Sequence, residues 1–183
     1  MTPRKVIVFS GSLRKESYNR LLLNKLVSMA PTHVSLNIFD ISPIPLYNED
    51  VEFSAYPPAV TNFKNLVKSA DGVIIVTPEY NYSIPGVLKN ALDWASRPPT
   101  DIPFTGKPGA IMGTSISQYG SLRSQLHLRQ VLFALGVRVM NTPEICVPKA
   151  KDLFATGDLI DERTISHLQK FWTAFTAWID NNL

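Results

Sequence analysis

The chain has 183 residues, of which 45% are hydrophobic and 18% are charged, and its net charge is +3. This length and composition are typical of a soluble globular protein, and we expect one domain over residues 1–183. No apolar run is long enough to cross a bilayer, and no dense basic stretch favours nucleic acid as a partner.

The N-terminus and the cysteine content indicate where the protein works. Residues 1–5 lead directly into a strand pattern, without the long apolar segment of a signal peptide. The single cysteine, Cys146, excludes an internal disulfide and fits a reducing compartment, so we expect a cytoplasmic protein. Because the three histidines are widely separated, we expect no metal site, and the apolar neighbours of Cys146 predict a buried thiol rather than a nucleophile.

Strand patterns and helix patterns alternate along the chain. Strands are predicted over residues 5–9, 33–39, 73–76, 108–112 and 137–140, with Cys146 and Val147 continuing the last one. Each is followed by apolar residues at helical spacing, over residues 21–30, 60–70, 87–95, 121–135 and 164–181. The segments 40–58 and 150–160 have no such spacing, and we expect irregular loops there.

This alternation predicts an α/β fold, in which a parallel sheet carries helices on both faces. Five βα units favour the flavodoxin-like strand order 2-1-3-4-5 over the six-stranded dinucleotide fold. In such a sheet the loops after strands one, three and four meet at one edge. Those loops are residues 10–19, 78–83 and 113–120, the most hydroxyl-rich stretches of the chain.

The first loop, GSLRKESYN, has the features of a phosphate site. Ser12, Ser17 and Asn19 can donate hydrogen bonds, and Arg14 can add a charged contact. The loop also runs into a helix N-terminus, which favours an anion, and we expect Arg14 and Asn19 to hold the phosphate. It matches neither the Walker A pattern nor GxGxxG. The alternative is a helix cap supplied by Ser17 or Asn19.

The other two loops suit a flat heterocycle with polar edges. The second offers backbone N–H and C=O groups and the Asn81 amide, while Tyr80 and Tyr82 could wall a pocket or cover the sheet edge. The third, GTSISQYG, offers small residues for close approach to a ring, with Tyr119 as a candidate lid. A phosphate at one loop and a ring between the other two describe FMN.

These motifs resemble those of a known family. GSLRKESYN resembles the GSxRxxSxN phosphate loop of the NADPH-dependent FMN reductases, and TPEYNYSIPGVLKNALDW is similar to their flavin-ring loop and following helix. Gly120-x-x-Arg123 followed by His127-Leu128-Arg129-Gln130 is similar to the chromate and quinone reductase branch, close to the azoreductases. The resemblance runs from about residue 5 to the last helix, and is loose after Asp40 and over residues 148–160.

The resemblance implies an FMN-dependent NAD(P)H oxidoreductase that reduces quinones, with azo compounds, chromate or free flavin as further acceptors. NADPH or NADH would be the donor, and the protein would supply no acid–base residue because the cofactor carries the chemistry. Donor and acceptor would use one flavin face in turn, which predicts ping-pong kinetics. We expect cofactor contacts from Ser10, Ser12, Leu13, Arg14, Ser17, Tyr18, Asn19, Pro78, Glu79, Tyr80, Asn81, Tyr82, Ser115, Ser117, Tyr119 and Gly120.

Two other functions use the same fold. A flavodoxin-type electron carrier would have no nicotinamide turnover, but such carriers are generally acidic, whereas this chain has a net charge of +3. A non-enzymatic binding module would hold no flavin. A yellow colour of the purified protein would distinguish the enzyme from the binding module. Bleaching of that colour by NADPH would distinguish the enzyme from the electron carrier.

The helix predicted over residues 121–135 has two apolar faces. One would pack on the sheet and comprises Leu128, Val131, Leu132 and Leu135. The opposite face, with Leu122, Leu126 and Phe133, would need the last helix or a partner chain to cover it. The resemblance implies a homodimer or homotetramer. Across a twofold interface through Leu126, we expect Arg123 and Glu144 to pair and Tyr82 to complete the flavin pocket.

Overall fold

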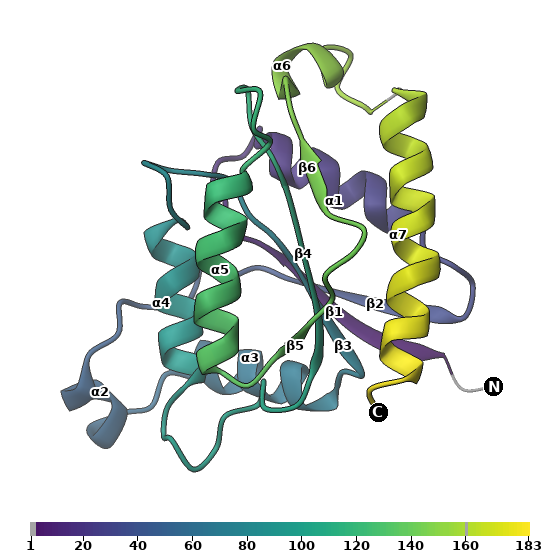
Figure 1. The fold of residues 1–183 in the computed structure, drawn as a ribbon. Helices are drawn as coiled ribbons and strands as arrows, with labels where there is room; N and C mark the ends of the chain where they lie inside the picture. Colours follow the sequence, from purple (N-terminus) through teal and green to yellow (C-terminus); the bar gives the residue numbers. More distant parts are fainter. Residues whose placement is uncertain (1–2, 160) are drawn as a thin grey trace.

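A parallel sheet lies between two layers of helices in the computed structural model, which describes residues 3–159 and 161–183 (Figure 1). In chain order the elements are β1 (Arg4–Ser10), α1 (Tyr18–Ser28), β2 (Val34–Phe39), α2 (Glu49–Ser54), α3 (Pro58–Ser69), β3 (Gly72–Val76), α4 (Gly86–Ala95), β4 (Pro108–Thr114), α5 (Leu122–Ala134), β5 (Arg138–Val139), β6 (Ile145–Val147), α6 (Ala150–Leu153) and α7 (Glu162–Asp180).

The strand order is β2-β1-β3-β4-β5, and every pairing between these strands is parallel. This confirms the predicted flavodoxin-like order. The apolar runs explain it: all five residues of β3 and the central Val6–Phe9 of β1 are buried, as expected for strands covered by helices on both faces. β2 is an edge strand, and only every second residue of its first half packs inward.

The fifth position of the sheet is divided between two short strands. β5 pairs with the beginning of β4, where Pro108 faces Arg138, and β6 pairs with its end, where Met112 faces Ile145. The strand predicted over 137–140 is therefore shorter than expected. The prediction that Cys146 and Val147 continue this position of the sheet is confirmed. Pro143 lies in the gap between β5 and β6, and it has no N–H to continue the ladder there.

The two faces of the sheet carry different helices. α1 and α7 cover one face, around Leu22, Leu26, Phe171 and Phe175. α3, α4 and α5 cover the other, around Phe63, Leu88, Trp94, Leu128 and Leu132. α5 and α7 consequently lie on opposite sides of the sheet (Figure 1). The alternative that the last helix covers the second apolar face of α5 is wrong for this reason.

Two segments predicted as irregular loops contain short helices. α2 lies within residues 40–58 and α6 within residues 150–160. Asn48 begins α2 by accepting a hydrogen bond from the Asp50 N–H, and Glu52 accepts one from Arg97 Nε. Helices of six and four residues are too short to show a repeating apolar pattern, so the sequence does not reveal them. None of the described helices is both long and apolar enough to cross a membrane.

Candidate functional site

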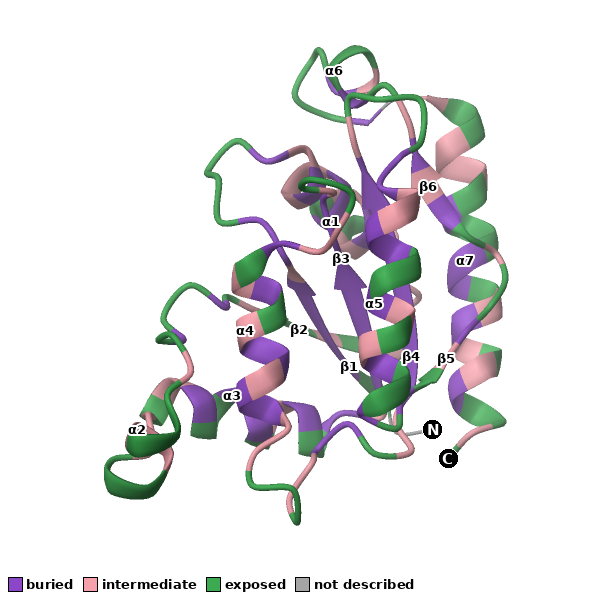
Figure 2. Ribbon diagram, turned by 60° about the vertical axis from the view of Figure 1, so that its left-hand side comes forward, coloured by how far each residue is buried: buried purple, intermediate pink, exposed green. Residues whose placement is uncertain are grey.

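The three predicted loops meet at the carboxyl edge of the sheet, where Figure 2 shows exposed loops above the buried ends of the strands. Asn19 joins the first loop to the end of β4. Its Nδ2 donates to the Thr114 carbonyl oxygen at 3.0 Å, and its Oδ1 accepts from the Thr114 N–H at 3.0 Å. Because this amide is buried and bonded through both of its polar atoms, it holds the first loop against the end of β4.

The first loop presents its backbone. Ser17 Oγ accepts from the Asn19 N–H at 3.2 Å and begins α1, so the predicted helix cap exists. Within the described residues, the N–H groups from Leu13 to Tyr18 have no acceptor. The exposed Arg14 guanidinium lies 5.3 Å from the centre of the Tyr18 ring. A run of free N–H groups at the positive end of a helix, beside a cation, suits a phosphate.

The second loop makes a tight reversal. Tyr80 and Ser83 exchange two N–H···O bonds of 3.0 Å, and the residues between them, Asn81 and Tyr82, have φ angles of 50° and 66°. Two left-handed residues define a type I′ turn, in which tyrosine is an uncommon occupant. The turn leaves the N–H groups of Asn81 and Tyr82 without an acceptor among the described residues. They can therefore serve a ligand.

Arg123 joins the second and third loops. The centre of its guanidinium lies 4.2 Å from the Tyr82 ring centre and 4.4 Å from that of Tyr119. Its Nη1 donates to Glu79 Oε1 at 3.1 Å. The cation–π contacts and the ion pair act on the same group, so one arginine holds both aromatic loops in place.

Glu79 holds the start of α5. Its Oε2 accepts from the backbone N–H of Arg123 at 3.0 Å and of Ser124 at 3.4 Å. A carboxylate at this position complements the helix dipole. Ser83 Oγ adds a 3.0 Å contact to His127 Nδ1, and Thr77 Oγ1 lies 3.1 Å from Ser124 Oγ. Sequence reasoning missed these contacts, because they join residues more than forty positions apart.

An open hollow of about 700 Å³ lies between the second and third loops. Its lining includes eight residues, most of which the sequence predicted as cofactor contacts: Glu79, Asn81, Tyr82, Ser115, Ile116, Ser117, Tyr119 and Arg123. Tyr82 and Tyr119 are 66% and 54% exposed, so both rings stand at the mouth of the hollow. The hydroxyls of Ser115 and Ser117 lie 2.8 Å apart on its wall.

The glycines that bound the third loop are required by the protein itself. A Cβ at Gly113 would lie 2.1 Å from the Thr77 carbonyl oxygen, and one at Gly120 would lie 2.5 Å from the Cys146 carbonyl carbon. Gly120 also has a φ of 56°. We expected small residues here so that a flavin ring could approach closely. At both glycines the space is occupied by neighbouring backbone of the protein itself, and Gly120 packs on β6 and does not line the hollow.

The other predicted contact residues divide by exposure. Leu13 and Tyr80 are 40% and 50% exposed at the edge, whereas Ser12 is buried below them. The Tyr18 ring packs on Phe154 with centres 6.0 Å apart. The Pro78 carbonyl accepts from Thr77 Oγ1, and Ser10 Oγ accepts from the Ser12 N–H. Leu126 and Glu144 are exposed outside the hollow.

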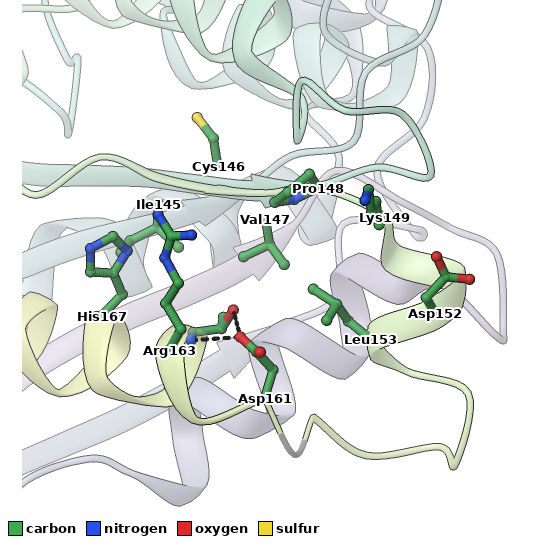
Figure 3. Close-up of a pocket in the computed structure, with 11 residues that line it drawn as sticks. Ile145, Cys146, Val147, Pro148, Lys149, Asp152, Leu153, Asp161, Arg163 and His167 are labelled. Atoms are coloured by element: carbon green, nitrogen blue, oxygen red, sulfur yellow. Dashed lines mark hydrogen bonds between the residues drawn. The ribbon is translucent and has the colours of Figure 1, made fainter.

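A second hollow, of about 390 Å³, lies between β6, α6 and the first turns of α7. Figure 3 shows Arg163 and His167 pointing from α7 toward β6, and the Asp161 carboxylate bonded to Thr164. Cys146 points away from this hollow, on the opposite side of the strand from Val147. Burial raises the pKa of the Cys146 thiol to about 11, so the thiol stays protonated at neutral pH. The side chain is half-buried, which is less than its apolar neighbours predicted.

Comparisons with known proteins agree with this geometry. Residues 4–152 match the family model described as NADPH-dependent FMN reductase. An NAD(P)H-dependent FMN reductase of Pseudomonas aeruginosa is 47% identical over 176 residues, 96% of this chain and 95% of the relative. A 2-hydroxy-1,4-benzoquinone reductase of Burkholderia sp is 44% identical over 176 residues, 96% of both chains.

A solved structure agrees as well. The flavoenzyme NAD(P)H:(acceptor) oxidoreductase of Paracoccus denitrificans is 37% identical and covers 98% of each chain, with a TM-score of 0.90. The predicted motifs, the strand order and the loops at the sheet edge thus coincide with the family match. The chain belongs to the NADPH-dependent FMN reductase family.

Proposed function

We propose that the protein is an FMN-dependent NAD(P)H oxidoreductase that reduces quinones. The observation that carries this proposal is a run of free backbone N–H groups, residues 13–18, at the same sheet edge as a hollow large enough for a ring. The names of its relatives, an FMN reductase and a benzoquinone reductase matched over nearly their full length, support the same conclusion.

The residues present fit FMN. The N–H groups of the first loop, with Arg14, would hold the phosphate, while the N–H groups of Asn81 and Tyr82 and the Asn81 amide would meet the polar edge of the ring. FMN supplies the hydride-transfer chemistry when bound. The chain orients and shields it: Arg123 keeps Tyr82 and Tyr119 at the mouth, and Asn19 holds the phosphate loop against β4.

The decisive experiment is an anaerobic titration of the purified yellow protein. NADPH should bleach the flavin absorbance within the turnover time, and a quinone should restore it. A flavodoxin-type carrier would keep its colour with NADPH and bleach only with dithionite. Protein that is purified without flavin and takes up none from an FMN solution would contradict the proposal.

The hollow between the second and third loops also suggests the order of the reaction. Donor and acceptor would occupy it in turn, which gives ping-pong kinetics. Azo compounds, chromate and free flavin are further candidate acceptors, since an open site of this size imposes little selection by shape. Initial rates at several NADPH and quinone concentrations should give parallel double-reciprocal lines. Intersecting lines would require a ternary complex.

We also propose that the protein is a homodimer or homotetramer through α5. Leu126 and Phe133 are 51% and 85% exposed on this helix, close to the exposed Tyr82 turn that His127 contacts through Ser83. Large apolar side chains grouped on one helix favour a protein partner. Arg123 already pairs with Glu79 in its own chain, so a contact with Glu144 of a second copy would be an addition to that pair. Light scattering at micromolar concentration that gives the mass of one 20.4 kDa chain would contradict this proposal.

A further inference from the structure

A cleft of about 380 Å³ lies between the first turns of α1 and the end of β2. Six of its lining residues matter here: Ser10, Lys15, Arg20, Leu21, Ile38 and Asp40. It is separate from the hollow between the second and third loops and shares none of its residues. It lies at the carboxyl ends of β1 and β2, beside the first loop and one strand away from the β1/β3 position at which this strand order binds its main ligand.

One end of the cleft is basic. Arg20 Nε donates to the Ser12 carbonyl oxygen at 3.3 Å, which fixes the guanidinium, while its Nη2 lies 4.0 Å from Asp40 Oδ1. Lys15 is exposed and has no hydrogen bond or ion pair among the described residues. Two cations therefore face a single carboxylate, and their remaining N–H groups are available to an anion.

The carboxylate in the cleft is already engaged. Asp40 accepts from the Ser42 N–H at 3.0 Å and from Ser42 Oγ at 2.6 Å. The Ser42 hydroxyl, together with Ser42 N–H and Arg20, keeps the pKa of Asp40 below its ordinary value against the effect of burial. Asp40 stays ionised at neutral pH but is turned toward Ser42, so the basic end keeps a net positive charge.

The other end of the cleft is apolar. Ile38 is 53% exposed, although Val34 and Leu36 on the same face of β2 pack against the core beneath α1 and α7. Leu21 of α1 also lines the cleft. A ligand with an anionic group at one end and a flat apolar ring at the other would cover Ile38 and neutralise the two cations.

We propose that this cleft holds the adenosine end of the nicotinamide donor, with the 2′-phosphate between Lys15 and Arg20. This inference rests on the proposed oxidoreductase function, which requires a dinucleotide donor. It makes NADPH the preferred donor, because NADH carries a hydroxyl at that position and leaves both cations without an anion. In dinucleotide folds a nearby arginine accommodates a 2′-phosphate, and here Arg20 of α1 lies beside Asp40, which follows β2.

The hollow of Figure 3 is the rival location. Lys149 and Arg163 line it, but so do the carboxylates of Asp152 and Asp161, which balance their charge. A doubly charged phosphate gains less there than beside Lys15 and Arg20. Arg163 is exposed on α7 and serves as a matched control for loss of one arginine charge.

Calorimetry with adenosine 2′,5′-bisphosphate tests the cleft without turnover, because this fragment of NADPH cannot donate a hydride. FMN-loaded wild-type protein should bind it at least about tenfold more tightly than adenosine 5′-monophosphate. Arg20→Gln and Lys15→Gln should each weaken it by about ten- to a hundredfold, whereas Asp40→Asn should strengthen it and Arg163→Gln should leave it unchanged. The kcat/KM for NADPH should fall in parallel, with that for NADH unaltered.

Equal affinity of wild-type protein for the bisphosphate and the monophosphate would overturn the inference, as would a loss confined to Arg163→Gln. If Arg20→Gln releases flavin because its bond to Ser12 is lost, Lys15→Gln decides, since Lys15 makes no such bond in the described chain. Failure of the oxidoreductase proposal has a different signature, namely flavin that neither NADPH nor NADH bleaches. If NADPH and NADH bleach the flavin at equal rates, only the inference about the cleft is contradicted.

Discussion

α7 and α5 cover opposite faces of the same sheet and differ in how completely they are buried. α7 buries Phe171, Trp172 and Phe175, and Trp172 Nε1 donates to the Leu26 carbonyl oxygen at 3.0 Å. α5 buries Leu128 and Leu132 but leaves Leu126 and Phe133 exposed. The chain itself completes the layer of α1 and α7, whereas the outer face of α5 has no cover within the described residues.

The loops at the sheet edge also differ, in this case in what holds them in place. The first loop leads into α1 and offers backbone N–H groups, which depend on the helix start and not on any distant side chain. The second and third loops depend on side chains of α5: Arg123, Ser124 and His127 each contact one of them or the residue before it. Changes in α7 should therefore alter stability, and changes in α5 should alter the site and assembly.

The largest effect is expected from Phe171→Ala. Loss of this fully buried ring should reduce the free energy of unfolding by about 3–5 kcal/mol. The matched change on the other helix, Phe133→Ala, should stay within about 0.5 kcal/mol in the separate chain, where that ring is 85% exposed. Both changes are therefore made in a Leu126→Glu background, in which the copies are separate. Urea denaturation measures both. Similar losses for the two variants would show that α5 is as buried as α7 in the isolated chain.

Arg14→Ala tests the loop that leads into α1. Removal of a charge-assisted bond to phosphate should cost about 1.5–3 kcal/mol, or about ten- to a hundredfold in FMN affinity. Fluorescence titration of flavin-free protein measures this, and Arg163→Ala, which removes the same charge on α7, is the control. If the variant holds FMN as tightly as the parent, the phosphate is not at this loop.

Glu79→Gln tests the dependence of the second loop on α5. The amide oxygen can still accept from the two backbone N–H groups, but the charge and the acceptor opposite the Arg123 guanidinium are lost, and we expect kcat/KM for a quinone to fall about tenfold. The free energy of unfolding should also fall, by about 1–3 kcal/mol, since the mostly buried Glu79 side chain loses its charge beside Arg123 and the start of α5. Glu144→Gln is the control within one chain. A larger effect at Glu144 than at Glu79 would indicate that Arg123 acts mainly across a subunit interface.

The smallest effect on the single folded chain is expected from Leu126→Glu, which should change the intrinsic free energy of unfolding of one chain, apart from the loss of its partner, by no more than about 0.5 kcal/mol. Its effect on assembly should be large, because a charge in the centre of an apolar interface separates the copies. Light scattering should report a single chain for this variant. Thr173→Glu, the same charge on the exposed side of α7, should leave the oligomer intact.

Much of the architecture follows from local patterns. The buried runs of β1 and β3 need cover on both faces, and their alternation with amphipathic helices leaves few arrangements other than a doubly wound sheet. The motifs GSLRKESYN and PEYNYS mark the two loops at which the site forms, because strand ends and helix starts leave polar groups unpaired. These features depend on neighbours in sequence.

Tertiary structure decided the contacts that join distant parts of the chain. Asn19 bonds to Thr114 across 95 positions, and Glu79 bonds to Arg123 across 44, so two residues predicted as cofactor contacts also hold loops in place. Apolar residues that recur at helical spacing predict which face of a helix is buried, but not which element covers that face. Only the packing of the folded chain shows that α7 and α5 lie on opposite faces of the sheet and that Leu126 and Phe133 remain exposed.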